Sequence, residues 1–398
     1  MAYDYSHRLG KASALLAGAD GLPLRHAPVR VRQVTQAFLY GCAAFESVAL
    51  LAGRPGGAER EHAQARMAAQ AEVFNFVTMP FYWGRYESEQ GKTNKDDVMR
   101  AARWWRERGA TVKGHPLCWH TVCAPWLMAY GDDEIYDMQL ARIRREVGGF
   151  AGVIDAWDVV NEAVIMPVFD KYDNAVTRIC RARGRVKLVK AAFEAAKQAN
   201  GGATLLINDF DLSESYVILL EGLLEAGVPI SAIGLQTHMH QGCMGEEQLA
   251  AVLERYSSFG LPLHFTELNI VSGRLMPPHI VDLNDYKADE WPSTPEGEER
   301  QAAEAERVYR QLFACPLAQA VTWWSFCDGG WLNAPAGLMT EDAREKPAFA
   351  ALRRLIKGEW LTPERQYVTD GEGRLEIAGF KGEYAAEYAG GSAVLYCR

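Results

Sequence analysis

Two glutamates stand directly after strand-like segments, where a carboxylate is free to do chemistry. Glu162 follows Trp157–Asn161, and Glu267 follows Leu263–Thr266. Two converging carboxylates suit hydrolysis of a glycosidic bond, because one can protonate the leaving oxygen while the other attacks the anomeric carbon. Two like charges in one cleft also resist joint ionisation, which separates their pKa values. The alternative is that one or both glutamates only form structural ion pairs.

The segments that must position these glutamates alternate between two patterns. Runs rich in β-branched and aromatic residues predict eight strands: Ala37–Ala43, Phe74–Thr78, Thr111–Leu117, Val153–Val160, Thr204–Asn208, Ile230–Gln236, Leu261–Thr266 and Ala320–Phe326. Amphipathic stretches between them predict helices near 59–72, 95–108, 134–147, 176–199, 213–226, 246–259, 297–313 and 343–357. This rhythm favours an α/β fold, a (β/α)8 TIM barrel, over a doubly wound sheet. Strands four and seven face each other in such a barrel, so Glu162 and Glu267 can share a cleft.

Both ends of the chain differ from its middle. Turn pairs at Asp20-Gly21, Asp370-Gly371 and Glu372-Gly373 lie between alternating strand patterns and predict β-hairpins. We therefore expect three parts: residues 1–36 and 358–398 pairing into one small β accessory module, and residues 37–357 forming the catalytic barrel. Two independent surface hairpins are the alternative. We expect the module to brace the barrel rather than to bind polysaccharide.

Composition excludes several classes of partner. The 398 residues carry 42 Lys plus Arg against 51 Asp plus Glu, a net charge of −9, with no basic block, so neither nucleic acid nor a membrane surface is an expected partner. The N-terminus lacks a signal-peptide pattern, so we expect a cytoplasmic protein unless a signal has been removed, in which case a secreted or periplasmic one. The eight cysteines form no CxxC pair. His238 and His240 could form a metal pair, but no further ligand cluster accompanies them, so we expect no metal and no cofactor.

The glutamates belong to an ordered series of motifs. WDVVNE at 157–162 resembles the acid/base motif of family 10 glycoside hydrolases, and TEL at 266–268 resembles the nucleophile strand of that family. Further segments are similar to the other strands and to the closing helix of the family: GHPLCWH at 114–120, LINDF at 206–210, IGLQTH at 233–238, VTWW at 321–324 and KPA at 346–348. Together the motifs run in order through about residues 39–357.

This resemblance implies a retaining double displacement, with Glu162 as acid/base and Glu267 as nucleophile. It also implies sugar-binding roles: Asn161 on the sugar 2-OH, Gln236 and His238 at the nucleophile, His115 and Trp119 before the cleavage point, His120 on the acid/base side, and Trp324 and Trp331 as apolar platforms. The implied activity is endo cleavage of β-1,4-xylan or xylo-oligosaccharides. Another decorated glycan or glycoconjugate, a β-glucan or mannan, and a non-catalytic carbohydrate-binding barrel are the alternatives.

Two segments depart from the family pattern. The Glu-Asn-x-x-Lys segment that follows the second strand is absent, and an aromatic run at 77–87 takes its place. Phe81, Tyr82 and Trp83 could block or reshape the glycone side there, with Arg85 or Glu87 supplying polar contacts, or the aromatic side chains could only pack the loop. The long loop 271–296 follows the seventh strand, and we expect it to shape the leaving-group side, with Trp291 as a sugar platform.

Overall fold

Eight parallel strands close into a barrel in this computed structural model, which describes residues 3–398. They are β3 (Leu39–Ala43), β4 (Phe76–Pro80), β5 (Thr111–His115), β6 (Ala156–Asn161), β7 (Thr204–Asp209), β8 (Ala232–Leu235), β10 (Leu263–Ile270) and β11 (Ala318–Trp323). Each strand pairs with the next, and β11 returns to β3. The prediction of a (β/α)8 barrel is confirmed, and every predicted strand overlaps an observed one. A two-residue strand, β9 (His238–Met239), pairs with the end of β10.

The helices that cover the barrel agree with the predicted spacing except at one position. They are α2 (Gly57–Val73), α4 (Lys95–Arg106), α5 (Asp132–Gly149), α6 (Ala175–Arg183), α7 (Arg185–Ala199), α8 (Glu214–Glu225), α9 (Glu246–Ser257), α10 (Pro295–Ala314) and α11 (Pro347–Arg354), with short α1 (Glu46–Leu51) and α3 (Trp83–Tyr86) in the loops. The single helix predicted over 176–199 is wrong. Gly184 has φ 87°, a left-handed conformation that ends α6 before α7 begins.

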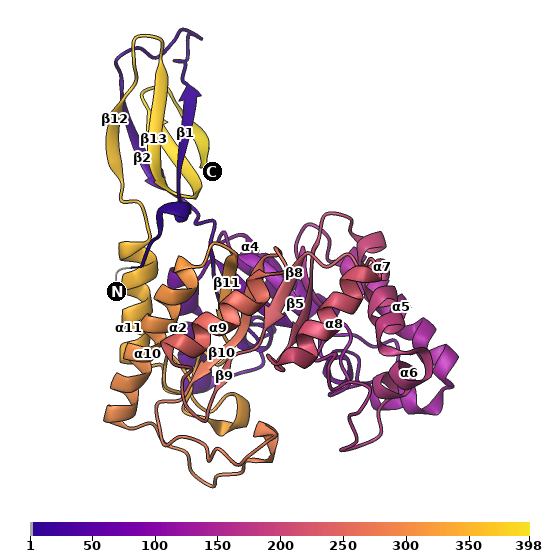
Figure 1. Cartoon of the computed structure of the whole chain (residues 1–398). Coiled ribbons are helices and arrows are strands. Elements are labelled where there is room, and N and C mark those ends of the chain that lie inside the picture. The colour runs from indigo at the N-terminus through magenta and orange to yellow at the C-terminus, as the bar shows by residue number, and fades with distance from the viewer. Residues whose placement is uncertain (1–2) are drawn as a thin grey trace.

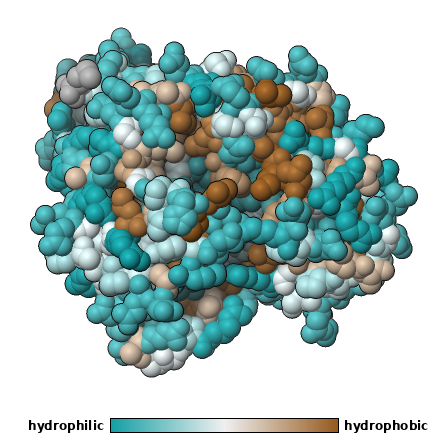
Figure 2. All heavy atoms as spheres, turned by 60° about the horizontal axis from the view of Figure 1, so that its bottom comes forward, coloured by the Kyte–Doolittle hydropathy of each residue, from teal (hydrophilic) through white to brown (hydrophobic). Residues whose placement is uncertain are grey.

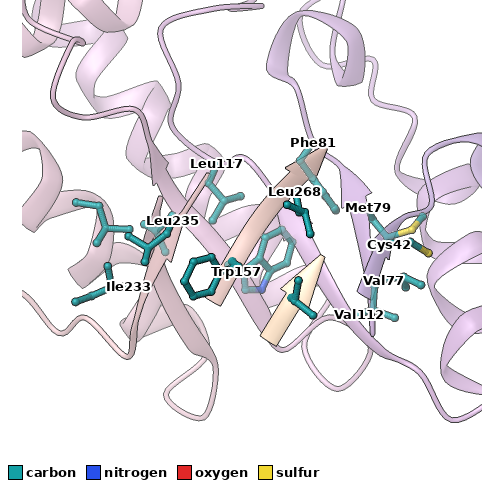
Figure 3. Packing of buried hydrophobic residues seen from close by; sticks show 14 of the residues in the cluster. Cys42, Val77, Met79, Phe81, Val112, Leu117, Trp157, Ile233, Leu235 and Leu268 are labelled. Atoms are coloured by element: carbon teal, nitrogen blue, oxygen red, sulfur yellow. The ribbon is translucent and has the colours of Figure 1, made fainter. Parts of the chain in front are cut away.

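The core lies around strands that are buried on both faces. All six residues of β6 and all eight of β10 are buried, as expected for parallel strands covered by helices. Trp157 of β6 packs across Gly114 of β5 and meets Phe81, its ring centre 4.8 Å away. Figure 3 shows Trp157 among the aliphatic side chains of this cluster.

The two ends of the chain form one accessory module, as predicted. Strand β1 (Leu9–Leu15) pairs with β13 (Arg374–Phe380), and a second sheet has the order β12 (Arg365–Val368), β2 (Pro28–Gln33), β14 (Gly382–Tyr388) and β15 (Gly391–Cys397). Residues from both ends share a separate core, including Val29, Val31 and Leu375. Each N-terminal strand therefore pairs with C-terminal ones, unlike independent hairpins. The domain boundaries at 36/37 and 357/358 stay predictions.

The module projects from the end of the barrel opposite the long segment between β10 and α10 (Figure 1). Arg8 anchors it, because its guanidinium donates to the carbonyls of Phe313, Cys315 and Ala318 beside the start of β11. Its place therefore fits a brace at the barrel's base, while its function stays a prediction. All eight cysteines are free thiols. No helix within residues 3–398 is long and apolar enough to cross a membrane.

We predict that Gly114→Ala destabilises the fold. The new Cβ would lie 2.2 Å from the Trp157 ring, so the strand or the indole must move, at a cost of about 1–3 kcal/mol in the free energy of unfolding. Gly222→Ala, in α8 with open space around it, should be neutral or stabilising by about 0.5–1 kcal/mol. Urea denaturation of both variants measures the difference, and equal stabilities would contradict the packing described here.

Candidate active site

Both glutamates lie at the carboxyl-terminal end of the barrel strands. Glu162 directly follows β6 and has φ 56°, a left-handed conformation that is strained for a residue with a side chain. Its backbone N–H donates to the Asn208 carbonyl at 2.7 Å. Glu267 was expected just after its strand, but β10 continues to Ile270. The register between β10 and β11 shifts between Phe265 and Leu268, so Glu267 lies within a strand irregularity.

Three side-chain amides link the two carboxylates. The Asn208 amide donates to Glu267 Oε1 at 2.8 Å and to Asn161 Oδ1 at 2.7 Å. The Gln236 amide donates to the same Asn161 oxygen at 3.2 Å and to Glu162 Oε1 at 3.4 Å, and Asn161 Nδ2 donates to Glu162 Oε1 at 3.2 Å. These contacts connect strands β6, β7, β8 and β10. The structure thus brings Glu162, Glu267, Asn161 and Gln236 together, and their individual roles stay predictions.

The environment of Glu162 favours its protonated form. Burial, opposed by the hydrogen bond from Trp119 Nε1 to Oε2 at 2.7 Å and assisted by the nearby charge of Glu267, raises the pKa of this carboxyl to about 8. His120 Nε2 lies 3.8 Å from the same oxygen. Burial lowers the pKa of His120 to about 4, so this imidazole is neutral near pH 7 and adds no charge to offset the glutamate.

Two imidazole rings lie beside the carboxylate of Glu267. His238 Nε2 lies 3.2 Å from Oε2, and His115 Nε2 lies 3.9 Å from Oε1. On its other side, His115 Nδ1 contacts Asp158 Oδ2 at 2.7 Å, and Lys113 Nζ reaches that oxygen at 2.6 Å. Burial alone would raise the pKa of Asp158, but Lys113 and His115 hold it below its ordinary value. An ionised Asp158 fixes the His115 ring so that Nε2 faces the nucleophile position.

Aromatic rings enclose the space beside Glu267. Trp324 lies 5.1 Å from His115 and 5.3 Å from Phe45, between ring centres. Tyr82 lies 5.6 Å from both His115 and Trp119, and 5.8 Å from Phe45. Figure 2 turns this end of the molecule forward and shows apolar side chains gathered near its middle among hydrophilic ones. Stacked against a sugar, such rings offer apolar surface to its C–H groups.

The four remaining residues that the sequence placed in the site have different surroundings. Half-buried Trp331 packs against His238, with ring centres 4.5 Å apart, which places it beside the site. Exposed Arg85 lies over the Tyr82 ring, 5.7 Å from its centre. Trp83 and Trp291 are each only 6% exposed. The loops enclose both rings. The predictions that Trp83 reshapes the glycone side and that Trp291 is a sugar platform stay predictions, which this burial disfavours.

The partners of these two buried rings show why they are held inside. Trp83 Nε1 donates to Glu87, and the ring packs against Trp126. Trp291 Nε1 donates to the carbonyl of Arg274, and its ring joins a small loop core with Val271, Met276, Ala334 and Ala336. One edge of Trp291 lines a surface hollow of about 330 Å³.

Three residues that sequence reasoning did not place in the site are part of it. Asn208 is the central amide donor, and it follows the same rule that found the glutamates, a polar side chain at a strand end. Asp209, next to it, accepts from the Val164 N–H, and burial raises its pKa to about 7. Phe45, which packs against Tyr82, comes from a loop, where no periodic pattern marks a residue as facing the cleft. Within residues 3–398 no group of three or more His, Cys, Asp or Glu could hold a metal ion, and the His238 and His240 rings lie 6.0 Å apart.

A closed (β/α)8 barrel with two glutamates on opposite strands, joined by amides and enclosed by aromatic rings, defines a glycoside hydrolase. The family model of glycosyl hydrolase family 10 matches residues 48–355, which independently indicates the same class of enzyme. The chain belongs to this family.

Curated relatives and solved structures agree with the family assignment. Endo-1,4-beta-xylanase A of Caldicellulosiruptor saccharolyticus is 28% identical over 60% of this chain and 71% of its own length. Endo-1,4-beta-xylanase B of Paenibacillus barcinonensis is 31% identical over 57% of this chain and 69% of its own. The crystal structure of xylanase 10B from Thermotoga maritima superposes with a TM-score of 0.64 at 22% identity, covering 81% of this chain and 96% of that one.

We predict that Trp119→Phe raises the pKa of Glu162 above its value of about 8. The indole N–H stabilises the ionised carboxylate, so its loss favours the protonated form. The pKa can be followed by NMR of the free enzyme with ¹³C-labelled glutamate side chains. Trp126→Phe is the matched control, because the Trp126 indole donates to the Glu87 carbonyl instead. A pKa that stays unchanged or falls in Trp119→Phe would show that the indole does not govern the acid.

Proposed function

We propose that this chain is a retaining endo-1,4-β-xylanase that uses Glu162 as acid/base and Glu267 as nucleophile. The observation that carries the proposal is the contrast between the two linked carboxyls. Glu162 is held protonated by burial and by its neighbour, whereas Glu267 accepts a hydrogen bond from the Asn208 amide and lies beside the His238 imidazole. The names of the relatives support xylan as the substrate. A structural neighbour, xylanase 10B from Thermotoga petrophila, was solved in complex with xylobiose.

In the first step, Glu162 gives its proton to the glycosidic oxygen as a Glu267 oxygen attacks the anomeric carbon. The carbon–oxygen bond of the glycoside breaks, the leaving sugar departs with the proton, and a glycosyl ester forms on Glu267. Burial still raises the pKa of Glu162, but the ester removes the negative charge of Glu267 that also raised it, so the pKa of Glu162 falls and its carboxylate forms more easily. It then takes a proton from water, whose oxygen attacks the anomeric carbon and releases Glu267 with retention of configuration.

The substrate would contact side chains already placed around the pair. Asn161 lies beside both the acid and Asn208, where it can meet the sugar 2-OH as the transition state forms. Trp324, Tyr82 and Phe45 supply apolar surface on the glycone side, where the family's Glu-Asn-x-x-Lys segment is missing. Glycone binding should therefore depend more on ring contacts than on charged hydrogen bonds.

A substrate panel tests the proposal directly. Linear xylan, arabinoxylan, β-glucan, mannan and aryl β-xylobiosides are incubated with the full chain, and products are identified by chromatography and by NMR of the anomeric configuration. The proposal expects internal cleavage of xylan with β-configured first products. Activity confined to β-glucan or mannan, α-configured first products, or release of single sugars from a chain end would refute it.

We predict that Glu267→Gln lowers kcat on xylan roughly 10⁴-fold or more, because the amide cannot attack the anomeric carbon. The fold and xylo-oligosaccharide binding should persist, since Gln keeps the shape of the side chain and one oxygen. Steady-state kinetics and calorimetric titration measure the two effects. Glu372→Gln, in an exposed turn of the module, should behave as wild type. Hydrolysis retained in Glu267→Gln would remove the nucleophile assignment.

We predict that Glu162→Ala separates substrates by leaving group. Activity on xylan should fall roughly 10²- to 10⁴-fold, whereas formation of the glycosyl-enzyme from an aryl glycoside with an acidic phenol should fall far less, because that phenol departs unprotonated. In wild type, kcat/KM on xylan should decline as the pH rises through about 8, where Glu162 loses its proton. Pre-steady-state bursts and pH profiles provide the measurements. An equal loss on both substrates, or a decline with pH that persists in the variant, would contradict the acid role.

A further inference from the structure

An ion pair joins the loop that follows the acid to the loop that follows the nucleophile. Lys171, between β6 and α6, places its Nζ 2.5 Å from Asp282 Oδ2 and 2.7 Å from Asp285 Oδ1, both between β10 and α10. Glu162 stands at the root of the first loop, and Glu267 lies on the strand that enters the second. The sugar must lie between these glutamates, so a contact between their loops spans the cleft. We call Lys171, Asp282 and Asp285 the crossbar.

The nucleophile-side end of the crossbar is firmly held. Asp282 caps a short 3-10 helix, Leu283–Asp285, by accepting from the Asn284 N–H. The Asn284 side-chain oxygen accepts from Trp331 Nε1 at 3.2 Å, and Trp331 packs against His238, which contacts Glu267. Beneath it lies the loop core around Trp291. This end is therefore fixed relative to the catalytic centre.

The acid-side end is held by a second set of contacts. Phe169 is buried, with its ring centre 4.5 Å from that of His120, and Tyr172 packs on Phe169 at 4.9 Å. Arg181 of α6 donates to the carbonyls of Pro167 and Phe169. Other contacts thus hold the backbone on both sides of the crossbar. Only the Lys171 side chain has to move for the ion pair to open.

The charges themselves favour a contact that opens. The side chains of Lys171, Asp282 and Asp285 are 41%, 34% and 64% exposed, so water and salt screen their attraction, and such pairs hold only weakly. A xylan chain is neutral and cannot compete for these charges, so it must break the pair to enter or pass beneath it. Because the acid faces the departing oxygen, the loop it leads into borders the leaving-group side.

We propose that the crossbar is a specificity determinant: it limits the leaving-group side to short sugar chains and slows the entry of polymeric ones. This inference rests on the proposed function and deepens it. Lys171 touches no reacting atom in this scheme, and it acts only by closing the space between the loops.

The test compares two substrates in the wild type and in Lys171→Ala. An aryl β-xylobioside presents no sugar on the leaving-group side, whereas xylohexaose presents several. In the variant, kcat/KM for xylohexaose should rise roughly threefold to tenfold, and that for the aryl glycoside should stay unchanged. Arg183→Ala is the matched control, because Arg183 forms an equally short, exposed ion pair with Asp133 between α6 and α5. It should change neither value.

Salt provides a second readout on unmodified protein. Raising NaCl from about 0.02 M to about 0.5 M should raise the wild-type ratio of xylohexaose to aryl-glycoside activity, since screening weakens the crossbar, and should leave the ratio in Lys171→Ala constant. If the wild type is active and Lys171→Ala leaves the ratio of xylohexaose to aryl-glycoside activity unchanged, the proposal for the crossbar is refuted and the proposed function stands. A fall in the ratio refutes the proposal for the crossbar too, because Lys171 would then bind sugar. A wild type inactive on both substrates overturns the proposed function instead.

Discussion

The structure depends on one electrostatic constraint: two carboxyls that face each other in a barrel cannot both be ionised cheaply. Burial and the mutual repulsion of Glu162 and Glu267 raise the pKa of the first, while the Asn208 amide donates to the second and His238 Nε2 lies 3.2 Å from it. The three amides and Glu267 lie on, or directly after, four neighbouring strands, β6, β7, β8 and β10. A shift of one strand would therefore disturb the protonation of the pair as well as its geometry.

The barrel supplies that precision through buried polar contacts as much as through apolar packing. Lys113 and Asp158 pair inside the barrel with no exposed surface, and Asp158 in turn orients His115. Removing one partner of such a pair leaves an uncompensated buried charge, which is far more costly than losing a surface ion pair. The scaffold and the site share these residues, so stability and catalysis cannot be altered independently at this position.

The fold and the catalytic pair could be predicted because each produces a local pattern in the sequence. Alternation of apolar runs and amphipathic stretches revealed the strands, and position after a strand revealed Glu162 and Glu267. The break between α6 and α7 at Gly184 could not be predicted, because the segments on both sides are amphipathic and look like one continuous helix. The orientation of loop side chains was harder to predict. Trp83 is held inside by the Trp126 ring and by a hydrogen bond to Glu87, and no periodic pattern in the sequence shows that Trp83, rather than Tyr82, makes these contacts.

The accessory module has a consequence for biosynthesis. Its β2 strand lies between β12 and β14, so the first residues to leave the ribosome must wait for the last before their sheet can form. Until then, Val29 and Val31 lack the C-terminal side chains that cover them. Contacts so distant in sequence form slowly. A chain that stops short of its final strands would carry exposed apolar edges at its N-terminus, marking unfinished molecules for aggregation or proteolysis.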